Sequence, residues 1–175
     1  DSVGSVTEFI TNMSVTDTGL EWKAGIFEEE MGLGNKDPKD GIYFHTKGDT
    51  VGVTASAYKH RRVMLYARKG TVQDSALVWT NDSTSQVNGT NYDRNEFNIY
   101  RWVRDRAGNI HAYINGVWKN KISVSPATTP KKRMTVGIVY KHRYARAART
   151  GIYIKYIGFT QIPKELDRDI ENPKF

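Results

Sequence analysis

Residues 97–122 constrain the fold of this chain most strongly, because they carry the turn signals of a three-stranded antiparallel meander. The dipeptide Asn115-Gly116 separates two short alternating stretches, and it is the strongest short hairpin signal because both residues accept a positive φ. The stretch 97–104 precedes a polar loop in which Gly108 is available for the same backbone conformation. This region therefore predicts antiparallel strands joined by tight turns.

The same period of two recurs along the rest of the chain, while helical periodicity is nearly absent. Leu20, Trp22, Ala24 and Ile26 alternate with polar residues or glycine. Many short strands between turn residues are typical of a sandwich or barrel. We predict an all-β fold, a two-sheet antiparallel β-sandwich, with one domain over 1–162 and a polar tail or linker over 163–175. The predicted strands are 5–15, 20–26, 41–46, 51–57, 63–68, 76–80, 97–104, 109–115, 117–123, 134–140 and 151–160.

Composition supports a globular domain, because 38% hydrophobic and 11% aromatic residues provide the anchors that disordered chains lack. The chain has no cysteine, so disulfides and thiolate metal sites are excluded. No apolar run approaches membrane-spanning length, and we expect no membrane insertion. The chain begins at Asp1 rather than Met, which leads us to expect a piece or processed product of a longer protein.

Three segments resemble the strand order of the concanavalin A-like and laminin-G-like jelly rolls. They are a strand ending in Asp at 98–105, a Gly-initiated strand ending in Asn-Gly at 108–116, and a last strand at 151–161. The resemblance implies that the N-terminal strand pairs beside the C-terminal one. It also implies glycan or protein binding, with a minority of glycoside hydrolases and lyases. The composition, rich in Tyr, Asn and Thr, is similar to that of bacteriophage tail-fibre, tailspike and capsid-decoration modules.

The charge is divided unevenly along the chain. Residues 1–40 hold nine acids and three lysines, whereas 106–164 hold twelve Lys and Arg and no acid, within a net charge of +7. A long stretch of one sign predicts a positive field suited to an anionic partner, and Arg suits carboxylate, phosphate or sulfate. A surface that merely carries its charge in loops is the alternative. The predicted anion-binding edge consists of Lys59, Arg61, Arg62, Lys141, Arg143, Arg146 and Arg149.

Aromatic residues suggest a second contact surface. Within 97–104, Phe97, Ile99 and Val103 share one strand face, which we expect to be the core. The opposite face would then be open for rings to stack against sugars, or would pack on a third strand or an oligomer partner. The predicted ligand-binding face consists of Tyr100, Trp102, His111 and Tyr113.

Catalytic signatures are weak. The segment Glu165–Glu171 approaches the paired-carboxylate pattern of laminarinase-type glycosidases, but Asp169 stands where the shorter form requires Glu. The four histidines are scattered, and no phosphate loop or nucleophile elbow is present. Carboxylates converging from distant strands, such as Glu21 or Glu96, are the remaining route to an active site. We expect no catalysis, no metal and no cofactor.

We therefore expect a non-catalytic binding module of an extracellular or virion-associated assembly, built as a homo-oligomer or larger complex. Its expected partner is a surface glycan or acidic polysaccharide, or an acidic protein subunit. The alternative is a structural virion protein held by contacts between acidic and basic parts of neighbouring subunits. Nucleic acid is the least expected partner, because no recognition element accompanies the basic charge.

Overall fold

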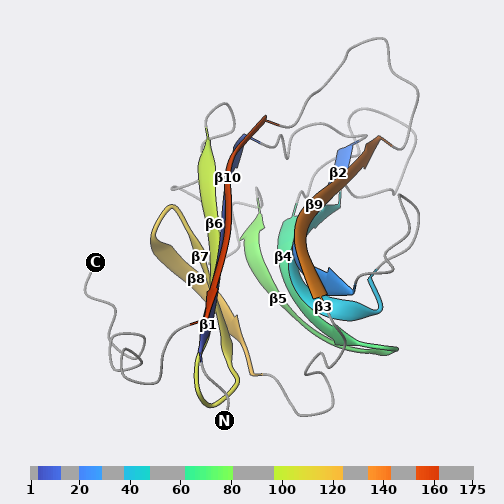
Figure 1. Cartoon of the computed structure of the whole chain (residues 1–175), viewed down its shortest axis with the longest axis vertical. Coiled ribbons are helices and arrows are strands. Elements are labelled where there is room, and N and C mark those ends of the chain that lie inside the picture. Colours follow the sequence, from blue (N-terminus) through green and yellow to red (C-terminus); the bar gives the residue numbers. More distant parts are fainter. Residues whose placement is uncertain are drawn as a thin grey trace.

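The computed structural model describes residues 4–12, 20–28, 38–47, 62–80, 97–123, 134–142 and 153–161, and in these residues the chain forms ten β-strands. The strands make two five-stranded antiparallel sheets that face each other (Figure 1). Sheet A contains, in spatial order, β10 (Tyr153–Gln161), β1 (Ser5–Asn12), β6 (Asn98–Arg104), β7 (Ile110–Ile114) and β8 (Val117–Ile122). Sheet B contains β5 (Val72–Thr80), β4 (Arg62–Lys69), β3 (Asp40–Lys47), β2 (Leu20–Glu28) and β9 (Met134–His142).

The two-sheet sandwich predicted from the sequence is confirmed. Each of the ten strands falls on a predicted stretch, and β1 pairs antiparallel with β10 as the resemblance implied. The predicted strand 51–57 and the tail 163–175 lie outside the described residues. No helix in the described ranges has the length and apolarity needed to cross a membrane.

The core lies between the sheets and is rich in aromatic residues. Alternate side chains of each strand point inward, as a period of two requires. The rings of Trp22 on β2 and Tyr100 on β6 meet edge to face across the two sheets, with centroids 5.2 Å apart. The largest buried side chains of this core are Trp22, Trp102, Tyr100, Phe9 and Phe44.

The turns of the meander have the predicted geometry. Asn115 and Gly116 have φ angles of 52° and 79°, and Gly108 has a φ of 90°. The Asn115 side chain adds two hydrogen bonds, because its Oδ1 accepts from the Ile99 amide and its Nδ2 donates to Asn98 Oδ1. The turn between β7 and β8 is thereby anchored to the neighbouring strand β6.

The expected orientation of β6 is wrong. Tyr100 and Trp102 have no exposed surface, while Phe97, Ile99 and Val103 are on the outer side of sheet A or at its end. The larger rings bury more apolar area. The smaller side chains are still half-covered on the outer face, because Ile99 lies opposite Ile10 and Val103 lies opposite Val6 on β1.

The two sheets differ in shape and in how they are closed. Sheet B is curved so that its outer face, turned away from sheet A, is the concave one (Figure 1). At one side of the sandwich, Asn120 Nδ2 on β8 donates to the Leu77 carbonyl on β5 and links the sheets. The opposite side is formed by the edge strands β9 and β10.

Candidate functional site

Side chains on the concave face of sheet B form the best candidate site. On β2 and β3, Trp22, Ala24, Ile42 and Phe44 point into the core, so the residues between them point to the concave side. The register brings these residues together, because Lys23 lies opposite His45 and Tyr43 lies opposite Tyr66. The concave-face cluster is defined as Glu21, Lys23, Phe27, Tyr43, His45 and Tyr66.

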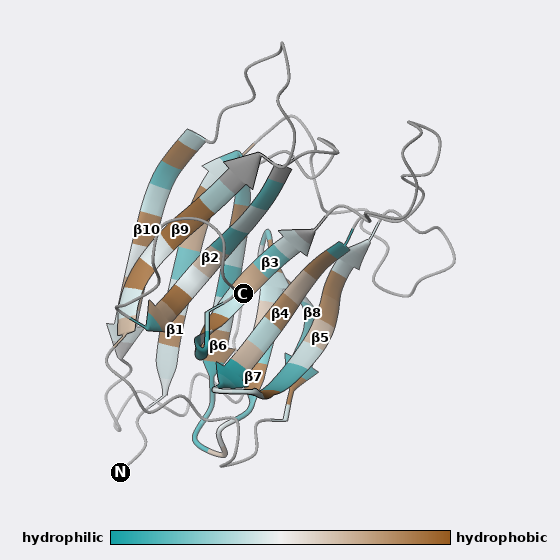
Figure 2. Ribbon diagram, turned by 90° about the vertical axis from the view of Figure 1, so that its right-hand side faces the viewer, coloured by the Kyte–Doolittle hydropathy of each residue, from teal (hydrophilic) through white to brown (hydrophobic). Residues whose placement is uncertain are grey.

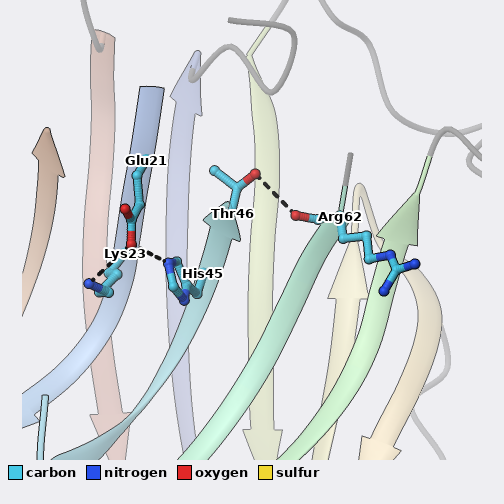
Figure 3. Close-up of polar contacts among 5 residues, drawn as sticks. All are labelled: Glu21, Lys23, His45, Thr46 and Arg62. Atoms are coloured by element: carbon cyan, nitrogen blue, oxygen red, sulfur yellow. Dashed lines mark hydrogen bonds and ion pairs between the residues drawn. The ribbon is translucent and has the colours of Figure 1, made fainter. Parts of the chain in front are cut away.

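Three of these residues form a polar group around one carboxylate (Figure 3). His45 Nε2 donates to Glu21 Oε1 at 2.8 Å, and Lys23 Nζ lies 3.5 Å from the same oxygen. Each of the three residues is at most 7% exposed. Buried charges are costly unless they are paired, so this cluster holds its donors and acceptors in fixed directions.

A row of rings continues from the polar group across the same face. Tyr43 stacks on Tyr66 with centroids 5.6 Å apart, and it contacts Phe27 at 5.4 Å on its other side. The His45 ring lies 5.7 Å from that of Tyr66. Tyr43 is buried whereas Tyr66 is half-buried, so Tyr66 is the ring through which the cluster reaches solvent.

Gly25 makes room for this row. A Cβ at Gly25 would lie 2.2 Å from the Ile42 carbonyl oxygen and 2.5 Å from Cα and Cβ of Tyr43. No side chain fits there without moving the backbone of β3. Gly25 therefore allows Tyr43 to lie flat against β2.

The predicted anion-binding edge is only partly described. Arg62 is exposed at the start of β4, where its carbonyl accepts a hydrogen bond from Thr46 Oγ1 (Figure 3). Lys141 occupies the backbone position opposite Glu21 near the end of β9. The registers of β2, β3, β4 and β9 place these two positions at the same end of sheet B. The other predicted residues, Lys59, Arg61, Arg143, Arg146 and Arg149, lie outside the described residues.

The predicted ligand-binding face of four residues is divided between the two sides of sheet A. Tyr100 and Trp102 are in the core, while His111 and Tyr113 lie on the outer side. Tyr113 is opposite Arg101 on β6. Burial raises the pKa of the Tyr113 hydroxyl, and the positive charge of Arg101 offsets part of that effect.

His111 belongs to the β6–β7 hairpin. Its Nε2 donates to Asp105 Oδ2 at 3.1 Å, and that carboxylate also accepts from the amide and the side chain of Asn109. Burial opposes ionisation of Asp105, but the hydrogen bonds from Asn109 and His111 outweigh it and lower the pKa of Asp105. Among the described side chains, no group of three or more His, Cys, Asp or Glu is placed to hold a metal ion.

Acidic residues of the N-terminal part have partners inside the domain. Glu8 Oε2 accepts from Arg101 Nε at 2.7 Å, Glu21 belongs to the concave-face cluster, and Glu28 Oε1 accepts from the Lys39 amide. Asp40 is buried. Glu21 and Asp40 are thus buried within the domain, whereas Glu8 and Glu28 remain partly exposed.

Most of the concave-face cluster is absent from the predicted binding residues. Glu21 is predicted only as a carboxylate that could converge with others from distant strands, and His45 is one of the four scattered histidines. The sequence does contain a signal for this cluster. In 20–28 and 41–46 the residues that alternate with the core positions include Glu21 and Lys23 on one strand and Tyr43 and His45 on the next.

Solved structures with the same fold include enzymes and binding domains. An alginate lyase from Pseudomonas aeruginosa is 11% identical with a TM-score of 0.52, over 91% of this chain and 65% of that one. A glycoside hydrolase family 16 endo-glucanase from Bacteroides ovatus is 10% identical with a TM-score of 0.51, over 89% and 69%. The receptor-binding domain of a botulinum neurotoxin of C/D mosaic serotype is 15% identical with a TM-score of 0.51, over 97% and 35%.

These likenesses show the fold alone, a two-sheet jelly-roll sandwich that occurs both in enzymes and in a receptor-binding domain. The chain spans just under two thirds of the lyase and about a third of the neurotoxin domain. No protein family matches the chain, and no characterised protein matches it in sequence. None of the three structures is a virion protein, so the bacteriophage setting stays a prediction from composition.

Proposed function

We propose that this domain is a non-catalytic glycan-binding module and that the glycan contacts the concave face of sheet B. The observation that carries the proposal is the row of contacting rings, Phe27, Tyr43 and Tyr66, beside the fixed Glu21–His45–Lys23 group. We expect the module to act in an extracellular assembly, where surface glycans are encountered.

The chemistry of the cluster suits a sugar. An aromatic face packs against the C–H side of a pyranose ring, while a small number of oriented polar groups select its hydroxyls. Tyr66 provides the accessible ring. The buried Glu21 carboxylate holds His45 and Lys23 in place, which lowers the entropy lost when a ligand binds.

An acidic polysaccharide is the ligand class that the charges favour. The chain carries a net charge of +7, and Arg62 and the Lys141 position lie at the end of sheet B where Glu21 is found. Carboxylate or sulfate groups along a glycan could reach these basic residues while a sugar ring stacks on Tyr66. One similar structure is named as an alginate lyase, which supports the choice of an acidic polysaccharide as a probe.

Binding can be measured by calorimetric titration with alginate, a sulfated glycan and a neutral β-glucan. We expect the acidic glycans to bind, and Tyr66→Ala to weaken that binding about tenfold or more, as for an anchoring aromatic. Tyr113→Ala is the matched control, because Tyr113 is another partly buried tyrosine on the outer face of the opposite sheet. The proposal fails if no glycan binds, or if both variants weaken binding equally.

A second candidate function is suggested by the proximity of His45, Tyr66 and Lys23. A polyuronate lyase needs a base to remove the proton next to the carboxylate and a cation to stabilise the resulting negative charge. Electrons then form a C=C bond as the glycosidic C–O bond breaks, and an acid protonates the leaving oxygen. Incubation of the protein with alginate separates the two functions, because only a lyase produces unsaturated chain ends with ultraviolet absorbance.

A further inference from the structure

We propose that the β10 edge of sheet A is a self-association interface, on which a second copy of this chain pairs antiparallel about a twofold axis. The inference does not depend on the ligand of the concave face. It starts from β10, which presents large apolar side chains to solvent on both of its faces. The exposed apolar residues of the edge formed by β10 and β9 are Tyr140, Tyr153, Ile154, Tyr156, Ile157 and Phe159.

The exposure of this edge is high. The six side chains are between 38% and 65% exposed, and apolar bands run along β9 and β10 at one edge of the molecule (Figure 2). Ile157 and Phe159 lie on the core side of sheet A, because they pair with Phe9 and Thr7 of β1. Both side chains are nevertheless exposed to solvent. The β5–β8 side, by contrast, is closed by the Asn120–Leu77 hydrogen bond.

The area is sufficient for a dimer. A fully covered aromatic side chain buries about 150–250 Å², so four half-exposed aromatics present roughly 400 Å², within the range of the largest apolar patch on a typical monomer. Two copies would bury up to about 800 Å² if all four rings are covered, and Tyr156 and Phe159 lie within the paired segment itself. The isoleucines and the edge backbone add to this area, and the total is then close to the roughly 1,000 Å² expected of a specific interface.

The backbone of β10 suits a second copy. Within the described strands β10 pairs only with β1, and long apolar edges of this kind are sites of strand addition. Identical strands that pair antiparallel are self-complementary about a twofold axis. A twofold axis at Gly158 would join sheet A of the two copies with their corresponding faces on the same side. It would place Ile157 of one copy opposite Phe159 of the other.

Lys155 fits this register. The pairing of β1 with β10 shifts at Ile10 and Thr11 and leaves Lys155 as the extra residue of a bulge. Bulges and lysines interrupt edge pairing, so the regular segment available for the second copy is 156–161. The two Lys155 residues then lie at opposite ends of the shared ladder and do not face each other.

Sedimentation velocity over a wide range of concentrations tests the proposal. We expect the wild-type protein to form dimers as its concentration rises. Tyr156→Arg and Thr160→Lys add charge at exposed β10 positions, and each should raise the dimer dissociation constant about tenfold or more. Trp118→Arg on β8 and Ser75→Lys on β5 are matched controls at exposed positions of the opposite edge. They should leave the dimer dissociation constant unchanged.

Salt gives an independent readout. Copies with a net charge of +7 repel each other, so apolar association through β10 should strengthen as salt screens that repulsion. Contacts between acidic and basic surfaces would weaken instead. The proposal is overturned if the protein is a monomer at every concentration, if the dimer survives both β10 variants, or if added salt dissociates it.

Discussion

Glu21 and His45 lie on neighbouring strands of sheet B, with Glu21 Oε1 and His45 Nε2 2.8 Å apart and both side chains almost completely buried. Lys23 approaches the same carboxylate oxygen. The carboxylate is therefore a centre on which two potential ligand-binding groups depend. Removal of Glu21 and removal of its charge alone should have different consequences.

We predict that Glu21→Ala lowers the free energy of unfolding by about 3–5 kcal/mol, because it removes the carboxylate that the buried Lys23 and His45 share. Glu21→Gln keeps an acceptor oxygen and nearly the same volume, so it should cost less. Urea denaturation of both variants measures the difference. Equal losses in the two variants would contradict a role for the carboxylate as hydrogen-bond acceptor.

Gly25 and Gly137 provide a matched pair, because they lie directly opposite each other on β2 and β9. A methyl group at Gly25 would collide with the backbone of β3, whereas one at Gly137 meets no atom within 4 Å. Gly25→Ala should cost about 1–3 kcal/mol or more through overpacking and should also weaken glycan binding by displacing Tyr43. Gly137→Ala should leave both denaturation and titration curves nearly unchanged.

The fold was predictable from the sequence because its signals are local. Alternation marked every described strand, and Asn115-Gly116 and Gly108 marked turns whose positive φ angles the structure contains. The faces of β6 were not predictable from alternation alone, because this strand is apolar on both sides. Arg101 shares a face with Ile99 and Val103, and its charge was the available sign that this face is the outer one.

The candidate site was harder to predict because it depends on long-range pairing. Lys23 and His45, and likewise Tyr43 and Tyr66, are neighbours only through the register of β2, β3 and β4. No spacing along the chain encodes that register. The predicted basic edge depended on charge density, and only Arg62 and Lys141 of its residues fall in described strands.

Truncation of Trp102 and truncation of Trp118 should lower stability to very different extents. Trp102 is completely buried between the sheets, whereas Trp118 is 51% exposed on β8. Trp102→Ala should lower the free energy of unfolding by about 3–5 kcal/mol through the cavity it creates, and Trp118→Ala by about 0.5 kcal/mol or less. Guanidinium denaturation measures both. A folded Trp102→Ala variant of normal stability that loses glycan binding would instead restore Trp102 as a ligand contact.

The turn at Asn115 allows backbone strain to be separated from side-chain hydrogen bonding. Asn115→Gly keeps the positive φ but removes the bonds to Ile99 and Asn98, which should cost about 1–2 kcal/mol. Asn115→Ala loses the same bonds and adds the strain of a Cβ in the left-handed region, about 1 kcal/mol more. Thermal unfolding of the two variants should therefore rank alanine below glycine, and the reverse order would contradict the turn geometry.

Asp105 should make the β6–β7 hairpin sensitive to acid. Burial works against its ionisation, but hydrogen bonds from Asn109 and His111 lower its pKa below the ordinary value of 3.8. A lowered folded-state pKa contributes stability that is complete above the unfolded value and is lost as the pH falls through the folded one. Asp105→Ala should thus cost about 1–3 kcal/mol near neutral pH, measured by urea denaturation, and the difference from wild type should shrink steadily below pH 3.8. A difference that stays constant into strong acid would show that the ionised carboxylate is not what stabilises the hairpin.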